Sequence, residues 1–215
     1  MPGTYPMLVD LTGKLVVVVG GGAVAVRKVK GLLDSGATQI CVIAPEIAPE
    51  MPERIKPLRR EFAPDDLNNA SLVFAATDSA EVNDLVTREA HRRGIWVNRA
   101  DAEDDSDFAT PAIWRKESLM VTVSTQGNPA LSAKIRDVIS IELDSKWEKL
   151  ATAAARLRPV ILRNVGEIES RRKIFRALAT DEAANVAGDE NELRRWLVSK
   201  FPGLDLQQPR PDDER

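Results

Sequence analysis

The segment Leu15–Lys28, which reads LVVVVGGGAVAVRK, decides the fold of this chain. It begins with five aliphatic residues without polar alternation, a pattern typical of a strand buried on both faces of a parallel sheet. Three glycines follow, and a helical pattern then runs from Ala23 to Ser35 and stops at Gly36, a residue suited to end a helix. A strand, a glycine turn and a helix in this order predict the first unit of a Rossmann-like dinucleotide-binding domain.

The glycine turn matches the fingerprint Gly-x-Gly-x-x-Gly/Ala, with Gly20, Gly22 and Ala25 at its three small positions. The first glycine allows a tight turn, the second lets the backbone approach a pyrophosphate, and the alanine lets helix and strand pack closely. Free N–H groups at the helix start would face the anion. The alternative interpretation is a tight turn in an α/β protein without a ligand. The residues predicted to bind the cofactor in this turn are Gly20, Gly21, Gly22, Ala23 and Val24.

The chain continues with alternating strand and helix patterns. The expected strands are Gln39–Ala44, Ile55–Phe62, Leu72–Ala76 and Ile95–Asn98, and the expected helix between the last two is Ser79–Arg93. The third of the five strands, Ile55–Phe62, is polar and resembles an edge strand. This order predicts an α/β fold with a doubly wound parallel sheet over residues 1–107.

Ligands of such sheets bind at the carboxyl ends of the strands. Thr77 and Asp78 directly follow one strand, and Pro45 and Glu46 follow another, so all four are assigned to the cofactor site. The fingerprint expects an acidic residue for the ribose, and Glu46 stands one or two positions late for it. Asp101 lies just past a strand end on the same edge, whereas the acidic run Glu103–Asp107 is predicted to be a solvated loop.

A second part of the chain follows from Phe108. Phe108–Trp114 and Leu119–Ser124 are expected to be strands, and Asn128 and Pro129 suit the start of a helix that runs past Leu143. Hydroxyls, a glycine and a helix start in one loop indicate a carboxylate-binding site, with ordinary helix capping as the alternative. The substrate residues predicted in this loop are Ser124, Thr125, Gly127 and Asn128.

The rest of the chain is predicted to be helical to about Lys200, with interruptions at Pro159, Gly166 and Gly188. The predicted organisation is therefore a dinucleotide-binding domain (1–107), a connecting region (108–145), a helical domain (146–206) and a disordered tail (207–215). Arginine and lysine residues gather between Arg156 and Arg176, either as a solvated helix face or as a docking surface for a polyanion.

Composition excludes several functional classes. The chain has 215 residues with a formal net charge of −3, so no overall positive charge argues for nucleic acid. No apolar run approaches the ~20 residues that span a bilayer, and Met1–Asp10 lacks a signal-peptide pattern. One histidine and one cysteine, Cys41, give no basis for a preformed metal site or an internal disulfide. We expect a cytoplasmic protein.

Several motifs in fixed order resemble the precorrin-2 dehydrogenase family, the N-terminal module of siroheme synthase, some members of which are also sirohydrochlorin ferrochelatases. These motifs are Gly20-Gly21-Gly22-x-Val24-Ala25-x-Arg27-Lys28, Ala75-Ala76-Thr77-Asp78 with Val82-Asn83, Val97-Asn98-x-x-Asp101, Asp107-Phe108-x-x-Pro111-Ala112 and Met120-Val121-x-Val123-Ser124-Thr125-x-Gly127. They extend from about Met7 to Leu143, and Ser170–Lys173 is similar to the family's basic helical segment.

The resemblance implies NAD-dependent oxidation of precorrin-2 to sirohydrochlorin by a homodimer, with residues 108–145 as the dimerisation region. It implies Asp101 as the catalytic residue and Ser124 and Thr125 as counterparts of the family's substrate-loop serines, one of them replaced by threonine. It also leaves open a second activity, insertion of Fe²⁺ or Co²⁺ into the tetrapyrrole product. The competing class is a non-enzymatic nucleotide-sensing regulatory domain. Such a domain would usually carry an acidic residue at the end of the second strand and would not need Asp101 or the loop after Val123.

Overall fold

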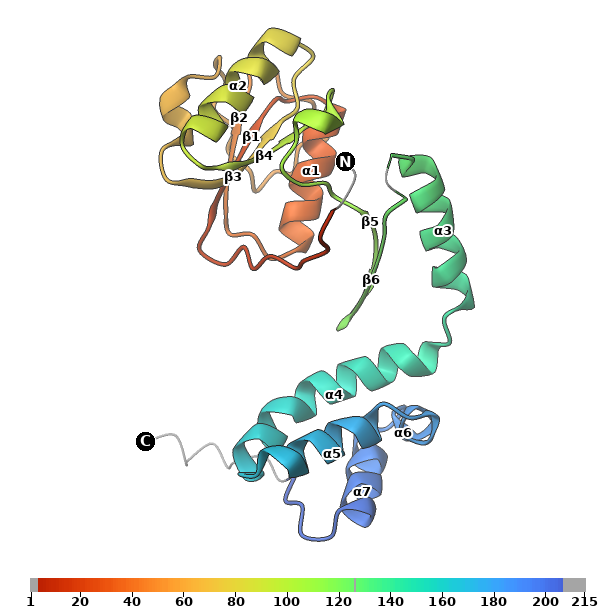
Figure 1. Ribbon diagram of the computed structural model, residues 1–215. Helices are drawn as coiled ribbons and strands as arrows, with labels where there is room; N and C mark the ends of the chain where they lie inside the picture. The colour runs from red at the N-terminus through yellow and green to blue at the C-terminus, as the bar shows by residue number, and fades with distance from the viewer. Residues whose placement is uncertain (1–3, 126, 207–215) are drawn as a thin grey trace. The chain divides into compact units, whose positions relative to one another are not determined.

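The computed structural model describes residues 4–125 and 127–206 and divides the chain into two compact units, Met1–Thr110 and Pro111–Arg215. The first unit contains the predicted parallel sheet, and the second contains a β-hairpin and five helices among its described residues (Figure 1). The predicted disordered tail, 207–215, lies outside the described residues. No helix among the described residues is long and apolar enough to cross a bilayer.

The sheet of the first unit has four parallel strands in the order β2-β1-β3-β4. The strands are β1 (Leu15–Val19), β2 (Gln39–Ile43), β3 (Ala70–Ala75) and β4 (Trp96–Arg99). The order reverses between β1 and β3, because β2 lies on one side of β1 and the later strands lie on the other. In open α/β sheets, this reversal is where ligands bind, at the carboxyl ends of the strands. The predicted Rossmann-like fold class is confirmed.

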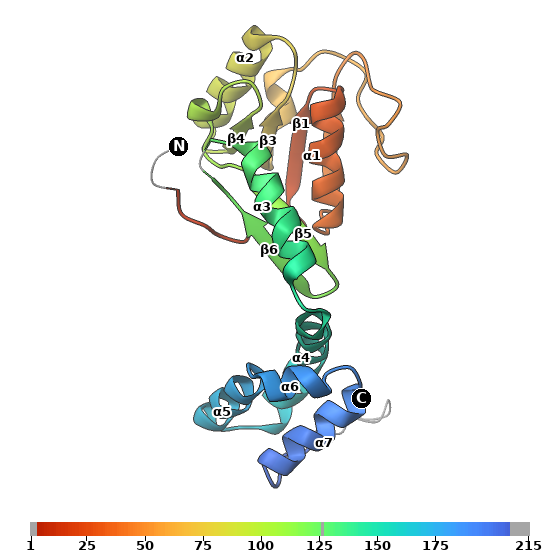
Figure 2. The same ribbon diagram turned by 90° about the vertical axis from the view of Figure 1, so that its right-hand side faces the viewer.

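Two helices cover opposite faces of this sheet (Figure 2). Alternate residues of β1 point to opposite sides, so Val16 and Val18 pack against α1 (Ala23–Asp34), while Val17 and Val19 belong to the core beneath α2 (Ala80–Arg92). All four valines are almost completely buried. Burial on both faces explains why β1 shows no polar alternation.

The predicted strand Ile55–Phe62 does not form. Only Leu58 pairs with the sheet: its N–H donates to the Val42 carbonyl at 2.8 Å, and its own carbonyl accepts from Ala44 at 3.1 Å. Pro57 has no N–H to donate and fixes its own backbone angle, so the segment touches β2 at one residue and then leaves it. A short 3₁₀ turn, η1 (Pro64–Leu67), leads on to β3.

The acidic run after β4 is also more ordered than a solvated loop. Residues Glu103–Asp105 form a 3₁₀ turn, η2, and Asp107 fastens the start of β4 by accepting the Val97 N–H at 2.9 Å. His91, in the last turn of α2, lies 3.3 Å from the Asp107 carboxylate. These contacts order the run, while Asp104, Asp105 and Asp107 stay exposed, as predicted for a solvated loop.

The second unit begins with an antiparallel hairpin of β5 (Ala112–Lys116) and β6 (Leu119–Val123), against which α3 (Pro129–Glu142) packs (Figure 2). The predicted helix start is confirmed: Pro129 is the first helical residue, and the Asn128 side chain accepts the Leu131 N–H at 2.9 Å. The helix ends at Glu142, with Leu143 as its C-cap residue, instead of running past Leu143, because Asp144 caps the next helix by accepting the Lys146 N–H.

A helical cluster completes the second unit. Its members are α4 (Ser145–Asn164), α5 (Ile168–Leu178), α6 (Asp181–Val186) and α7 (Glu190–Lys200), and they share a core that includes Leu157, Ile161 and Leu193. Gly166 and Gly188 lie between helices, as predicted. Pro159 does not interrupt the chain but lies inside α4. The buried neighbours Leu157, Val160 and Ile161 hold the helix together across the missing hydrogen bond.

Candidate functional site

The glycine turn between β1 and α1 contains three glycines, and the structure gives a different reason for glycine at each position. Gly20 has φ +128°, and a Cβ there would lie 2.1 Å from the Ala76 carbonyl oxygen at the end of β3. A Cβ on Gly21 would lie 1.9 Å from the Glu46 carbonyl oxygen, and the Gly21 carbonyl accepts the Ala48 N–H at 2.9 Å. Gly20 and Gly21 are therefore required by the protein's own backbone. Gly22 is different, because a Cβ there would meet nothing within 4 Å.

The open space at Gly22 lies at the N-terminus of α1. Gly22 is the capping residue, it provides no side-chain cap, and the first turn of the helix contains no acidic residue. The partial positive charge and the uncapped N–H groups of this helix end favour an anion. A pyrophosphate fits these residues, since the glycine leaves the space and the helix supplies the electrostatic attraction. Ala23 is exposed and Val24 is half-buried beside this position, while Ala25 is buried against the sheet.

The loop after β2 borders the glycine turn. Pro45 and Glu46 are both exposed, and the backbone of Glu46 contacts Gly21. The close contact between the two loops fixes the Glu46 backbone next to the turn, and its carboxylate is accessible to a ligand.

Thr77 and Asn83 form a tight polar pair at the end of β3. The Thr77 hydroxyl donates to Asn83 Oδ1 at 2.8 Å, the Thr77 N–H donates to the same oxygen at 3.2 Å, and Asn83 Nδ2 returns a bond to the Thr77 carbonyl at 3.0 Å. Asn83 is fully buried, and the Ser79 hydroxyl caps α2 by accepting the Val82 N–H. These bonds fix the turn that carries Thr77 and the exposed Asp78.

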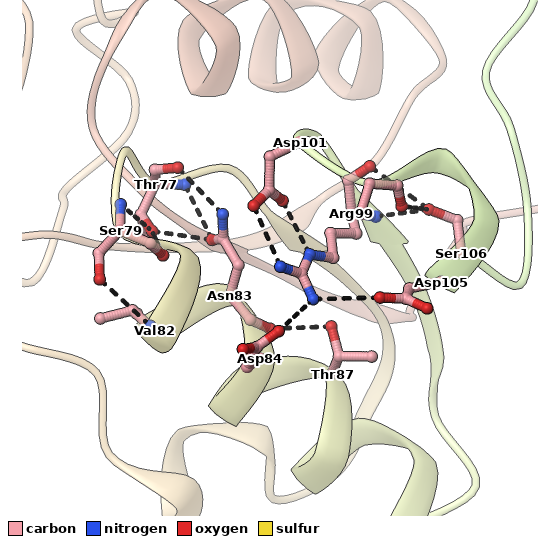
Figure 3. A network of polar contacts seen from close by, with 11 residues as sticks. Thr77, Ser79, Val82, Asn83, Asp84, Thr87, Arg99, Asp101, Asp105 and Ser106 are labelled. Carbon is pink, nitrogen blue, oxygen red and sulfur yellow. Dashed lines mark hydrogen bonds and ion pairs between the residues drawn. The ribbon is translucent and has the colours of Figure 1, made fainter. Parts of the chain in front are cut away.

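Asp101 is held by Arg99, the last residue of β4 (Figure 3). Arg99 Nε donates to Asp101 Oδ1 at 2.8 Å and Nη2 donates to Oδ2 at 3.1 Å, which makes the pair bidentate. The same guanidinium donates through Nη1 to Asp84 of α2 and, at 3.3 Å, to Asp105 of η2. The Arg99 residue is only 9% exposed, whereas the Asp101 side chain is 36% exposed. The candidate catalytic carboxylate is therefore accessible, and its orientation is fixed.

The hydrogen bonds from Arg99 hold the pKa of Asp101 below its usual range, and a further bond from the Asn83 side chain acts in the same direction. Partial burial opposes both effects. The pKa of Arg99 is raised by the same contacts, chiefly the hydrogen bonds with Asp101. Asp101 is consequently ionised at neutral pH.

The loop after β6 belongs to the second unit, and most of its polar groups bond to one another. The Thr125 hydroxyl donates to the Asn128 carbonyl at 2.7 Å and lies 2.8 Å from the Ser132 hydroxyl, and the Thr125 N–H donates to Ser132 as well. The Asn128 side chain caps α3. Ser124 and Gly127 are exposed, with φ +117° at Gly127. Capping thus explains Asn128, and Ser124 is the loop hydroxyl most accessible to a ligand.

Sequence reasoning missed Arg99, Asn83 and Asp84 as members of the site. An arginine at the end of a predicted strand, two residues before the candidate aspartate, was the available signal for Arg99. The positions of Asn83 and Asp84 depend on how α2 packs beside β4, which no local pattern gives. Asn98 was quoted in a motif without a role. Its amide donates to the Phe108 carbonyl, while its buried Oδ1 has no hydrogen-bond partner among the described residues.

The fold and the glycine turn together define a Rossmann-like dinucleotide-binding protein. Residues 7–112 match the family model described as putative NAD(P)-binding. Over almost its whole length the chain is homologous to siroheme synthases, which confirms the resemblance seen in its motifs. It is 37% identical over 210 residues to a siroheme synthase of Methylobacillus flagellatus and 32% identical over 206 residues to one of Azotobacter vinelandii.

These two matches cover 93% and 92% of this chain but 44% of each relative, so the chain spans less than half the length of the siroheme synthases that it matches. Among solved structures, one described as "SirC, precorrin-2 dehydrogenase" is similar with a TM-score of 0.74 and 25% sequence identity. That match covers 91% of this chain and 100% of the other.

Proposed function

We propose that this chain oxidises precorrin-2 to sirohydrochlorin, with NAD⁺ as the hydride acceptor. The observation that carries the proposal is an accessible, oriented carboxylate, Asp101, on the same sheet edge as an open glycine turn suited to a pyrophosphate. The proposal is also supported by the similarity of the chain to siroheme synthases and to a protein described as a precorrin-2 dehydrogenase.

The reaction removes two protons and two electrons from the reduced macrocycle. When bound, NAD⁺ accepts one hydrogen with both electrons as a hydride, and the other hydrogen leaves as a proton. The chain itself has to position the substrate against the cofactor for hydride transfer and to accept that proton. We assign proton acceptance to the Asp101 carboxylate, which is ionised and can pass the proton on to water because its side chain is 36% exposed.

The cofactor would be held along the carboxyl edge of the sheet. Gly20, Gly21, Gly22, Ala23 and Val24 surround the pyrophosphate position, Pro45 and Glu46 stand on the ribose side, and Thr77 and Asp78 stand at the end of β3. Glu46 is the residue that favours NAD⁺ over NADP⁺, because a carboxylate accepts hydrogen bonds from a ribose 2′-hydroxyl and repels a 2′-phosphate.

The substrate is a polycarboxylate, and we assign its recognition to the loop of Ser124, Thr125, Gly127 and Asn128. The exposed Ser124 hydroxyl can donate to a carboxylate, while the bonds of Thr125 with Asn128 and Ser132 keep the loop in shape. We further propose a homodimer that forms through residues 108–145 and a cytoplasmic location. The support for the dimer is apolar surface in this region that stays exposed although α3 packs against the hairpin: Ile113 of β5 is 41% exposed and Ile141 of α3 is 80% exposed.

Two alternatives are tested by the same assay. A nucleotide-sensing regulatory domain would bind NAD⁺ without turning over a substrate. Insertion of Fe²⁺ or Co²⁺ into sirohydrochlorin stays a prediction from the family resemblance.

The test is an anaerobic assay of the purified chain with precorrin-2 and NAD⁺, followed by addition of Fe²⁺ or Co²⁺. We expect formation of sirohydrochlorin and NADH in equal amounts. Asp101→Asn should bind NAD⁺ normally but turn over ~10²–10⁴-fold more slowly, as is typical when a general base is lost. Glu50→Gln, which removes an exposed carboxylate in the loop after β2, is the matched control and should keep full activity. NAD⁺ binding without any NADH production would contradict the proposal.

A further inference from the structure

We infer that Arg99 is a positioning residue for Asp101, which fixes the orientation of that carboxylate while Asp84 and Asp105 hold the guanidinium in place. The inference rests on the proposed role of Asp101 in the oxidation. Figure 3 shows the guanidinium between Asp101 on one side and the other two carboxylates on the other.

The bidentate contact restricts how the Asp101 carboxylate can turn. Both of its oxygens accept from Arg99, at 2.8 and 3.1 Å, so the carboxylate cannot rotate without breaking one of the two bonds. Each carboxylate oxygen has a second lone pair, and these remain for a substrate or water. A lysine in place of Arg99 could supply the charge but not this planar pair of donors.

The guanidinium is itself held by two further carboxylates, because Asp84 of α2 and Asp105 of η2 both accept from Nη1. The backbone of Arg99 is held as well, since its main-chain N–H donates to the Ser106 hydroxyl at 2.8 Å. With these contacts, Arg99 keeps two anionic partners if Asp101 takes up a proton. A buried guanidinium with no other partner would be left uncompensated at that moment, which is costly. The network therefore lets Asp101 change charge without moving Arg99.

Arg99 of β4 is the charged group that contacts the Asp101 carboxylate, and the Asn83 side chain of α2 donates a further hydrogen bond to it. Asp84 of α2 and Asp105 of η2 contact the guanidinium of Arg99, on the side away from Asp101. Removal of the Arg99 side chain should raise the pKa of Asp101, because partial burial disfavours the ionised carboxylate and the largest effect that opposes it would be lost.

The test compares Arg99→Met, Arg99→Lys and Arg92→Met in the full chain. Arg92 is the matched control, an arginine on α2 whose side chain is 64% exposed and pairs with Glu89. Two readouts are needed: the pH profiles of kcat and kcat/KM for precorrin-2, and the carboxyl ¹³C titration of Asp101 by NMR without substrate, assigned with Asp101→Asn. Circular dichroism and the Kd for NAD⁺ report whether each variant folds.

We expect Arg99→Met to raise the pKa of Asp101 by about one unit or more. The acidic limb of the pH profile of kcat/KM should shift to higher pH by the same amount. Arg99→Lys should leave that limb nearly in place but lower kcat about tenfold or more, with KM changed less than twofold, because orientation is lost while charge is kept. Arg92→Met should match the wild type in every readout. If Arg99→Met fails to fold, Arg99→Lys alone decides the question through kcat.

Unchanged kcat and an unchanged pH profile in the folded Arg99 variants would overturn the inference. An unchanged Asp101 titration in Arg99→Met would overturn it as well, and that readout needs no substrate. The titration therefore separates failure of this inference from failure of the proposed function. If instead Asp101→Asn retains full activity while the titration of Asp101 does shift in Arg99→Met, the contact is real but the assignment of Asp101 to catalysis is wrong.

Discussion

Replacing Gly22 by aspartate should abolish cofactor binding without harming the fold. A side chain at this position meets nothing within 4 Å, and its backbone has φ −81°, which any residue adopts. The residue caps α1, where aspartate is preferred over glycine by a few tenths of a kcal/mol and gains ~0.3–1 kcal/mol from the helix dipole. Gly22→Asp should therefore be as stable as the wild type or slightly more stable.

The same carboxylate would stand where the pyrophosphate is proposed to bind. Two unit charges about 5 Å apart repel by about 3 kcal/mol at an effective dielectric constant of about 20. That energy corresponds to a loss of affinity on the order of 100-fold, and occupation of the space by the side chain adds to it. Affinity for NAD⁺ should thus fall by at least that factor.

The assay is calorimetric titration with NAD⁺, together with thermal unfolding. Gly21→Asp is the contrasting variant, because its Cβ would lie 1.9 Å from the Glu46 carbonyl oxygen, so the loop after β2 must move. It should lose at least ~1–3 kcal/mol of stability, the usual cost of overpacking. Unchanged NAD⁺ affinity in a folded Gly22→Asp protein would refute the placement of the cofactor. A lowered Tm in Gly22→Asp would refute the assignment of open space there.

Two further predictions concern Lys28 and the assembly. Burial, with a smaller effect of Arg27, lowers the pKa of Lys28 to about 8, while the unfolded chain keeps about 10.5. The unfolded chain therefore binds more protons between these values, so wild-type stability should rise as the pH increases from about 8 to 10.5. Lys28→Met should lack this rise and be more stable than the wild type at pH 7 by about 1 kcal/mol, a figure reduced for partial exposure and for the lost bond to Thr110. The measurement is denaturant unfolding at several pH values. If the free energy of unfolding of the variant still rises with pH as in the wild type, the argument is wrong. Light scattering should give about twice the chain mass of 23.6 kDa, and a monomer at micromolar concentration would disprove the homodimer.

The sequence alone determined the class of fold and the place of the glycine turn. Short-range patterns carry this information: an aliphatic run with no alternation is a strand covered on both faces, and glycines directly before an amphipathic helix make an anion-binding turn. Asn128 and Pro129 likewise identify a helix start because capping is a local interaction. The family resemblance added Asp101, since its motifs lie in a fixed order along the chain.

Only the tertiary structure decided what packs against these local elements. Ile55–Phe62 has a strand-like composition, yet it makes one bridge at Leu58 because Pro57 removes a donor. Pro159 stays inside α4 because buried neighbours offset its cost. Gly20 and Gly21 are required by the carbonyls of Ala76 and Glu46, which approach from distant strands.

The surroundings of Asp101 show the same division. Its position after a strand follows from sequence, but its partners come from separate elements: Arg99 ends β4, Asp84 lies on α2 and Asp105 lies in η2. The pKa of a carboxylate depends on charges within a few ångströms, whatever their separation along the chain. A sequence pattern can therefore indicate a candidate catalytic residue, whereas the groups that contact its side chain are determined by packing in three dimensions.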